Sequence, residues 1–312
     1  MRKLGIFFIL IAIPVAFTLI KASGLSANEI TVNTANVEDK IINIPTDTNS
    51  QLNQNIPEIV SQNPVSTSSG QTSNQCQPDI GAQIVVIRYL NNPYAVYEMN
   101  SDSRWPIASI TKLMTAVIAL ENVDQNKKIT LTADIISKQD NYSELKKGGI
   151  YTVKDLIKAM MMISSNNAAD AIARDFGEEN FIALMNQKAR GLSMFNTQYF
   201  DPTGLTVNNQ STPNDLIKLI TYIYNNYPDL LKMTRTRKDY VTDLNSDRRI
   251  TLTNIDDFAG QVGFIGGKTG YIDQSQGNLI SLFKESNGPV VFVVMGSQNR
   301  FGDTQKLLNC LK

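Results

Sequence analysis

Residues 105–120 read WPIASITKLMTAVIAL, and this stretch is the most informative part of the sequence for both the fold and the chemistry. Apolar residues follow Ser109 at helical spacing, at Leu113, Met114, Val117, Ile118 and Leu120. Ser109 and Lys112 stand three positions apart where this pattern begins, so both side chains lie on one face of the helix. A neutral lysine amine this close to a hydroxyl can take its proton. The stretch therefore predicts an apolar helix that begins with a serine nucleophile and a lysine base.

Two other stretches share this serine–lysine spacing. Ser143 and Lys146 lie in a polar segment, where the lysine would be solvated and charged. Ser281 and Lys284 lie on a predicted strand, on which positions three apart face opposite sides. A lysine acts as a base only where burial or a neighbouring cation lowers its pKa. The pair that contains Lys112 is therefore favoured, with an ordinary helix start as the alternative.

Two further short motifs follow, and each is weak by itself. Residues 164–166 read SSN at the junction of two predicted helices, where a helix cap is the ordinary explanation. The same pattern occurs at residues 61–63 and 297–299. Residues 268–270 read KTG on a predicted strand, directly after two glycines that would let a substrate backbone approach closely.

The composition excludes several kinds of chemistry. The chain has 312 residues, 29 basic and 29 acidic side chains, two cysteines and no histidine. Without histidine there is no Ser-His-Asp or Cys-His pair and no histidine-ligated zinc, and two cysteines cannot build a thiolate zinc site. The zero net charge argues against a nucleic-acid-binding protein. Acid–base catalysis must therefore use Lys, Asp, Glu, Tyr or Ser.

The chain divides by composition into three parts. Residues 1–27 hold two basic residues before an apolar run, which is typical of an export signal or an N-terminal membrane anchor, and cleavage stays open. Residues 28–76 are rich in Asn, Thr, Ser, Gln and Pro and lack aromatic residues, so we expect a disordered tether. Residues 77–312 are long enough for one substantial core. We expect this part to be exported, to the periplasm or the extracellular face of the cytoplasmic membrane.

The patterns in residues 77–312 predict two strands, then five helices, then four strands and a last helix. The strands are expected at residues 84–89, 95–99, 249–253, 262–267, 277–284 and 290–297. The helices are expected from residue 109 onward and at residues 153–162, 167–175, 179–190, 213–225 and 302–310. Thr152 and Thr212 are the expected N-caps of the helices at 153–162 and 213–225. This order predicts an α/β fold with an antiparallel sheet that joins both ends of the chain. Helices flank the sheet, and an all-helical lobe is inserted in its middle.

The three motifs are more specific together than singly, because they occur in a defined order along the chain. Ser-x-x-Lys, Ser-x-Asn and Lys-Thr-Gly form the motif set of penicillin-binding proteins and class A β-lactamases. Over residues 83–297 the chain resembles the low-molecular-weight penicillin-binding proteins, the serine D-alanyl-D-alanine carboxypeptidase/endopeptidase family. Four segments carry the resemblance. Residues 105–116 resemble the family's Pro-Ala-Ser-x-Thr-Lys-Leu-Met-Thr segment, and residues 163–169 resemble its Ser-Gly-Asn-Asp-Ala-Ala segment. Residues 200–205 resemble its Asn-Pro-Thr-Gly-Leu segment, and residues 268–271 its Lys-Thr-Gly strand. The resemblance implies the serine β-lactamase/D,D-peptidase-like fold.

The chain departs from the family pattern in two places. Ser165 and Asn167 stand where the second motif often has Gly and Asp, and neither replacement removes a catalytic group. Only 44 residues follow Lys268, so we do not expect the extra C-terminal β-domain of many family carboxypeptidases.

The resemblance implies serine acyl transfer with three catalytic residues. Neutral Lys112 would deprotonate Ser109, which attacks the D-Ala carbonyl and forms an acyl-enzyme. Ser164, hydrogen-bonded between the two motif lysines, would relay a proton to the leaving amine. Backbone N–H groups of Ser109 and Tyr271 would form the oxyanion hole.

The resemblance also implies the substrate-binding residues. Asn166 would orient the acyl side chain, while Lys268 and Thr269, followed by Gly270 and Tyr271, would meet the substrate carboxylate. The expected substrates are peptidoglycan stem peptides, and β-lactams are the expected covalent inhibitors. No metal or organic cofactor is needed. The membrane is a partner only through an uncleaved N-terminal segment.

For a D,D-peptidase, carboxypeptidase activity is slightly favoured over endopeptidase activity. Two other functions are the alternatives to a D,D-peptidase. A class A β-lactamase would add a deacylating glutamate in a Glu-x-x-Leu-Asn loop, and no such segment lies between Asn166 and Lys268. A non-catalytic wall-binding protein would be expected to lose Ser109 or Lys112, and both are present.

The two cysteines are Cys76 and Cys310. In an exported protein they are candidates for a disulfide, with two independent thiols as the alternative. We expect a pair because the fold brings the two ends of residues 77–312 together at the sheet.

Overall fold

The computed structural model describes residues 78–136 and 145–311. The expected export segment, the expected tether and Cys76 lie outside the described residues. Within the described ranges, none of the helices combines the length and the apolar character needed to span a membrane. The described cysteine, Cys310, is not a free thiol. Its expected pairing with Cys76 stays a prediction.

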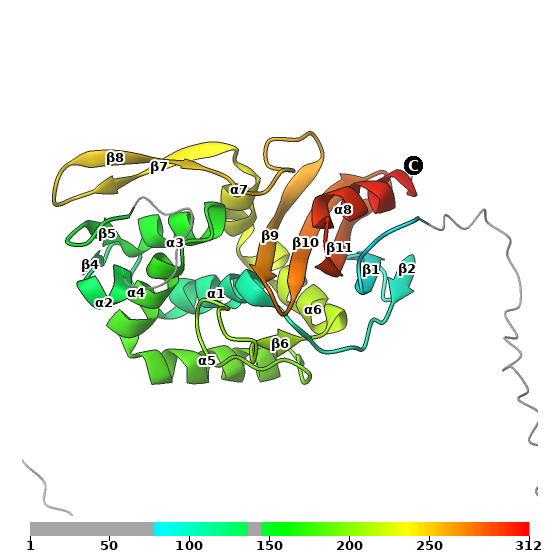
Figure 1. Ribbon diagram of the computed structural model, residues 1–312, viewed down its shortest axis with the longest axis horizontal. Coiled ribbons are helices and arrows are strands. Elements are labelled where there is room, and N and C mark those ends of the chain that lie inside the picture. Colours follow the sequence, from blue (N-terminus) through cyan, green and yellow to red (C-terminus); the bar gives the residue numbers. More distant parts are fainter. Residues whose placement is uncertain (1–77, 137–144, 312) are drawn as a thin grey trace, which may run out of the picture. The chain divides into compact units, whose positions relative to one another are not determined.

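A five-stranded antiparallel sheet lies at the centre, in the order β2-β1-β11-β10-β9 (Figure 1). Its strands are β1 (Ile84–Tyr89), β2 (Tyr97–Met99), β9 (Phe264–Ile272), β10 (Gln276–Glu285) and β11 (Gly288–Ser297). β1 pairs with β11 from Ile84 opposite Met295 to Tyr89 opposite Val290. The prediction that the sheet joins the two ends of residues 77–312 is therefore confirmed.

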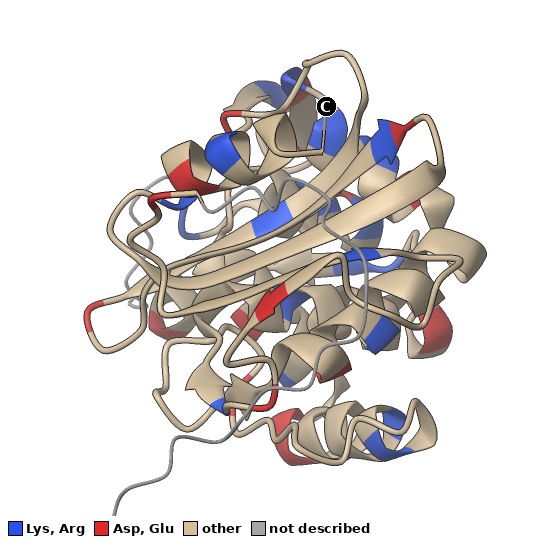
Figure 2. Ribbon diagram, turned by 90° about the vertical axis from the view of Figure 1, so that its right-hand side faces the viewer, with Lys and Arg blue, Asp and Glu red and all other residues tan. Residues whose placement is uncertain are grey.

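Both faces of this sheet are buried, because apolar residues fill successive positions of its central strands. In β10, Ile280 and Leu282 face the helical lobe, whereas Leu279 and Phe283 face the opposite side. That opposite side is covered by α8 (Arg300–Asn309), which packs on β10 and β11. The strands that cross the middle of Figure 2 are mostly tan, and the charged residues lie chiefly on surrounding helices and loops.

The helical lobe is inserted between β2 and the C-terminal strands, as predicted (Figure 1). It contains η1 (Ala108–Thr111), α1 (Lys112–Asn122), α2 (Ala133–Ile136), α3 (Val153–Met162), α4 (Asn166–Phe176), α5 (Glu178–Gly191), α6 (Pro213–Asn226) and α7 (Pro228–Arg235). Two predicted caps are present: the side chains of Thr152 and Thr212 accept hydrogen bonds from Asp155 N and Asp215 N. The first eight residues of α1 are all buried, so this helix is the centre of the lobe.

Three pairs of short strands complete the architecture. They are β3 (Trp105–Pro106) with β6 (Gln210–Ser211), β4 (Lys128–Thr130) with β5 (Ile150–Thr152), and β7 (Lys238–Asp243) with β8 (Arg248–Thr253). The sequence patterns predicted only the last strand of these six. The β7–β8 hairpin extends along α3 and β5 in Figure 1.

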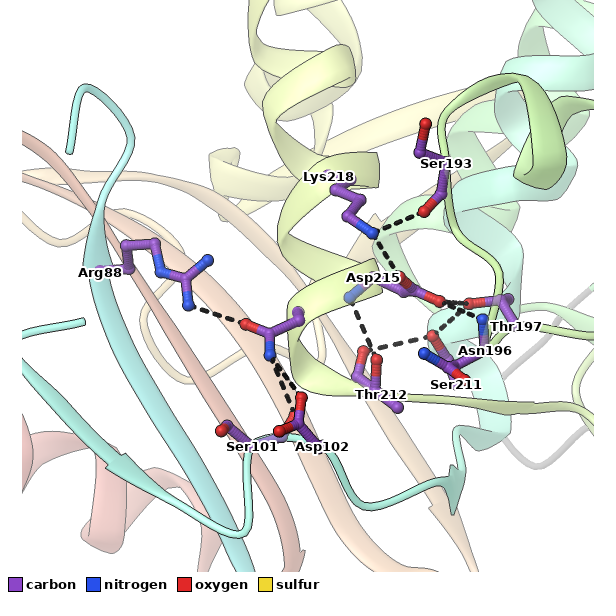
Figure 3. A network of polar contacts seen from close by, with 11 residues as sticks. Arg88, Ser101, Asp102, Ser193, Asn196, Thr197, Ser211, Thr212, Asp215 and Lys218 are labelled. Atoms are coloured by element: carbon purple, nitrogen blue, oxygen red, sulfur yellow. Dashed lines mark hydrogen bonds and ion pairs between the residues drawn. The ribbon is translucent and has the colours of Figure 1, made fainter. Parts of the chain in front are cut away.

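Polar contacts hold the start of α6 against the rest of the molecule (Figure 3). Arg88 on β1 donates to Asn214 Oδ1 at 2.7 Å, and Asn214 Nδ2 donates to Asp102 Oδ1 at 3.1 Å. The buried Asp215 accepts from Thr197 Oγ1 at 3.0 Å. These contacts fix α6 to β1, to the loop between β2 and β3, and to the loop that returns from α5.

Candidate active site

The first motif lies where η1 passes into α1. Lys112 is fully buried, and its Nζ lies 2.9 Å from Ser109 Oγ. Ser109 itself is half-buried and lines a cleft of about 900 Å³. Ala108, just before it, has a φ of 48°, a left-handed value that costs a non-glycine residue energy. The backbone is thus held in a tight turn that presents Ser109 to the cleft.

Lys112 is held from two further sides. Its Nζ donates to Asn166 Oδ1 and to the backbone carbonyl of Thr203, both at 2.6 Å. Asn166 begins α4, and Thr203 lies in the loop between α5 and β6. The amine is therefore aimed at Ser109 by one side chain and one carbonyl from separate parts of the lobe.

The second motif stands between α3 and α4. Ser164 has a φ of 58°, and its Oγ lies 3.0 Å from Lys268 Nζ. Ser165 caps α4 by accepting a hydrogen bond from Ala168 N at 3.2 Å. The ordinary explanation for this motif, a helix cap, is therefore correct for Ser165, while Ser164 and Asn166 turn to the two lysines.

The third motif is part of β9, the edge strand of the sheet. The predicted strand ended at residue 267, but β9 continues to Ile272 because β10 pairs with it as far as Gln276. Lys268 and Thr269 are 2% and 3% exposed. Burial and the positive charges of Lys112 and Arg300 hold the pKa of Lys268 well below its usual value, whereas Asp256 acts in the opposite direction.

Two glycines allow separate chain segments to meet at Ser109. A Cβ on Gly270 would lie 2.8 Å from the carbonyl oxygen of Ile107 and 3.2 Å from Ser109 N. A Cβ on Gly204 would lie 2.0 Å from the carbonyl oxygen of Ala108, and Gly204 has a φ of +83°. The strand β9 and the α5–β6 loop can pass this close only with glycine at these positions.

The cleft brings together all eight residues that the sequence predicted. Six of them line it: Ser109, Ser164, Asn166, Thr269, Gly270 and Tyr271. The other two, Lys112 and Lys268, are buried and reach the cleft through their contacts with Ser109 and Ser164. The alternative pair Ser281 and Lys284 is separated on β10, with the serine buried and the lysine exposed. Ser143 lies outside the described residues.

Arg300 also lines the cleft, although it is not among the residues that the sequence predicted. It is the first residue of α8, and its Nη1 donates to the carbonyl of Gly270 at 2.9 Å. No motif marks a single arginine 32 positions after Lys268. Leu205, from the segment 200–205 that resembles the family pattern, and Ile255, from the loop between β8 and β9, line the same cleft.

Known proteins match the chain in both sequence and structure. A family model described as D-alanyl-D-alanine carboxypeptidase, peptidase S11, matches residues 71–299. The D-alanyl-D-alanine endopeptidase of Escherichia coli is 32% identical over 241 residues, which cover 74% of this chain and 77% of that protein. The D-alanyl-D-alanine carboxypeptidase DacF of Bacillus subtilis is 30% identical over 210 residues, 65% of this chain and 54% of that protein.

The fold agrees with a solved penicillin-binding protein. The cefotaxime-bound form of penicillin-binding protein D2 from Listeria monocytogenes matches with a TM-score of 0.67 and 29% identity, over 76% of this chain and 99% of that chain. The predicted D,D-peptidase-like fold is therefore confirmed. Because the family match spans well over half of the sequence, the chain belongs to the peptidase S11 family, the serine D-alanyl-D-alanine carboxypeptidases.

Proposed function

We propose that the chain cleaves D-Ala–D-amino-acid bonds of peptidoglycan stem peptides through an acyl-enzyme on Ser109. The observation that carries the proposal is the 2.9 Å contact between Ser109 Oγ and the buried Nζ of Lys112, in a cleft that also holds the Ser164–Lys268 pair. A hydroxyl nucleophile and an adjacent amine are the parts that an acyl transfer without histidine needs.

In the acylation step the proton of Ser109 Oγ passes to neutral Lys112 Nζ while Oγ forms a bond to the carbonyl carbon. The carbonyl oxygen becomes an oxyanion, for which Ser109 N and Tyr271 N would be the donors. Gly270 supports this assignment because it brings β9 beside Ser109 N. The C–N bond then breaks: Ser164 would give its proton to the leaving amine and take one from protonated Lys112, which becomes neutral again.

In the deacylation step, a water molecule attacks the ester and gives its proton to Lys112. Lys112 then returns this proton to Ser109 Oγ as the ester C–O bond breaks, which regenerates Ser109 and releases the shortened peptide.

The substrate carboxylate would bind at the end of the cleft formed by the third motif. Lys268 and Thr269 offer an ammonium and a hydroxyl, and Arg300 adds a further cation beside Gly270. Asn166 would donate from its amide nitrogen to the acyl side chain, because its Oδ1 is occupied by Lys112. These roles select a substrate that ends in, or carries, a carboxylate beside the scissile bond.

β-Lactams would acylate the same serine. The relative from Listeria monocytogenes is solved with ampicillin and with cefotaxime, which supports this inference for the present chain. Rapid hydrolysis of the acyl-enzyme, as in a β-lactamase, is not expected. In the loop whose Thr203 carbonyl contacts Lys112, the nearby carboxylate is Asp201. Both of its oxygens accept hydrogen bonds from backbone N–H groups of the loop, so we do not expect Asp201 to activate a water molecule for deacylation.

Endopeptidase activity is the second candidate beside carboxypeptidase activity, since relatives of both kinds match the chain. Incubation of the full chain with purified peptidoglycan, followed by mass spectrometry, separates the two. Released D-alanine indicates a carboxypeptidase, and cleaved cross-links indicate an endopeptidase. Neither product from the wild type, or the same products from Ser109→Ala, would contradict the proposed function.

We also propose that the catalytic part acts outside the cytoplasmic membrane. Peptidoglycan lies there, and the basic and apolar pattern of residues 1–27 supports export. Whether these residues remain as a membrane anchor can be decided by N-terminal sequencing of the protein from its cell envelope.

A further inference from the structure

The side chain of Arg300 crosses one strand of the sheet to reach the cleft. Arg300 begins α8, which packs on β10 and β11 (Figure 1). A Cβ on Gly277 of β10 would lie 3.4 Å from Arg300 Cδ, so this glycine leaves room for the arginine stem. Beyond it, Arg300 Nη1 donates to the carbonyl of Gly270 on β9 at 2.9 Å. The place of the guanidinium in the cleft therefore depends on where α8 begins.

The start of α8 is held by a buried carboxylate that the mechanism above does not use. Asp303, in the first turn of α8, is 4% exposed, and its Oδ2 accepts a hydrogen bond from Ser297 Oγ at 2.6 Å. Ser297 ends β11, and its Oγ accepts from Asn299 N at 2.9 Å. The carbonyl of Asn299 accepts from Asp303 N, also at 2.9 Å. These three bonds close a ring, and Arg300 lies on the chain between Asn299 and Asp303.

The same carboxylate holds the chain that leads into the sheet. Gly81, just before β1, donates its backbone N–H to both oxygens of Asp303, at 3.2 Å each. Lys306, further along α8, donates to the carbonyl of Asp79. Asp303 thus joins the end of β11, the start of α8 and the segment before β1. Hydrogen bonds to a carboxylate are about twice as strong as neutral ones, so this junction is firm.

We propose that Asp303 is a positioning residue, which fixes the start of α8 so that Arg300 reaches the part of the cleft that receives the substrate carboxylate. The inference rests on the proposed function, which assigns the guanidinium of Arg300 to that carboxylate. Asp303 is not among the residues that line the cleft, so it acts through Arg300. The segment at Gly81 takes part in the same junction, which links the entry of the chain to substrate recognition.

A role in stability alone predicts a different result. A carboxylate that only stabilises the fold would change the acylation of every substrate alike. A carboxylate that positions Arg300 changes the preference for substrates that carry a carboxylate. The measured quantity is therefore the ratio of the acylation rate constants of a penicillin and of its methyl ester, in which that group is neutral. Mass spectrometry of the protein adduct gives both second-order rate constants.

The full chain should react faster with the acid than with the ester. Arg300→Gln should lower the acid-to-ester ratio roughly 10-fold, the value of one hydrogen bond between charged groups, while Lys268 and Thr269 keep the remaining preference. Asp303→Asn should lower the ratio by roughly 3- to 10-fold, since Arg300 is present but no longer fixed. The double variant should have the ratio of Arg300→Gln, because Asp303 acts only through Arg300.

Asp215→Asn is the matched control. Asp215 is also a buried carboxylate in the first turn of a helix, α6, and it accepts hydrogen bonds from Asn196 N and Thr197 Oγ1. It is not among the residues that line the cleft. Its substitution should lower stability in urea unfolding and leave the acid-to-ester ratio unchanged.

An unchanged ratio in Asp303→Asn, or an equal change in Asp215→Asn, would overturn the inference. A double variant with a lower ratio than Arg300→Gln would do the same, because Asp303 would then act by another route. If Asp303→Asn does not fold, Ser297→Ala carries the same prediction, since it removes the hydroxyl between Asp303 and Asn299.

Failure of the proposed function gives a separate result. A wild type that is acylated by neither compound contradicts the proposed function itself. An acylated wild type without a preference for the acid, or an Arg300→Gln variant that keeps the full preference, contradicts the carboxylate site at Arg300 and the role of Asp303 with it.

Discussion

A single carboxylate in the α5–β6 loop should control both stability and the catalytic lysine. Asp201 Oδ1 accepts hydrogen bonds from Thr203 N and Thr203 Oγ1, both at 2.6 Å, and from Gly204 N at 2.7 Å. Its Oδ2 accepts from Thr206 N at 3.0 Å. The loop that these bonds organise places the Thr203 carbonyl 2.6 Å from Lys112 Nζ.

The substitution Asp201→Asn removes the charge and keeps one acceptor oxygen. The side-chain amide nitrogen that replaces Oδ2 would face Thr206 N, so two hydrogen-bond donors would oppose each other. Hydrogen bonds to a charged group contribute about 1.5–3 kcal/mol each, and neutral ones about half as much. Losing one bond and halving three should lower the free energy of unfolding by about 4 kcal/mol, the lower end of the sum, because Asp201 is only half-buried. Because Lys112 then loses its fixed carbonyl, acylation should slow by roughly 10- to 100-fold, equivalent to about 1.4–2.7 kcal/mol.

Urea unfolding and the rate of labelling by fluorescent penicillin measure the two effects separately. Asp229→Asn, on the exposed surface of α7, is the matched control and should change stability by less than about 0.5 kcal/mol. An Asp201→Asn protein with wild-type stability would refute the account of the loop. A destabilised but folded variant that acylates at the wild-type rate would refute the link from the Thr203 carbonyl to Lys112.

Three other substitutions test the remaining parts of the account. Lys112→Arg should slow acylation by at least about 100-fold although the charge is kept, because guanidinium does not give up its proton in proteins. If the variant is active in the labelling assay, another group takes the serine proton. Gly270→Ala should abolish labelling while the circular dichroism spectrum stays native, because the added Cβ would lie 2.8 Å from the Ile107 carbonyl oxygen. Normal labelling would contradict the close approach of β9 to the backbone beside Ser109. Asp256→Asn should be more stable than the wild type by up to about 3 kcal/mol above pH 6. The folded-state pKa of Asp256 lies above its ordinary value of 3.8, so the wild type loses stability as the pH rises from about 4 to about 6. A difference in free energy of unfolding between variant and wild type that does not change with pH, measured by urea unfolding, would contradict this.

The sequence predicted the parts of the fold that depend on local patterns. The continuous apolar runs of β10 and β11, the helix after Ser109 and the caps at Thr152 and Thr212 all appear where expected. Periodicity and capping are properties of neighbouring residues, so they are visible without the fold.

Other elements depend on contacts that local patterns do not contain. The strand β7 reads KDYVTD, in which charged residues hide the pattern, and α7 has only eight residues. The strand β7 forms because it pairs with β8 and packs on α3, and α7 forms because it packs on α3 and on β9. Arg300 enters the site in the same way, since its place in the cleft beside Gly270 comes from the packing of α8 against the sheet.

The serine that the motifs predict can be tested by one measurement. The full chain is incubated with a penicillin, digested and analysed by mass spectrometry for the residue that carries the drug. The prediction is an adduct of the intact drug on Ser109 and none in Ser109→Ala. An adduct on any other residue, or an unmodified wild-type protein, would contradict it.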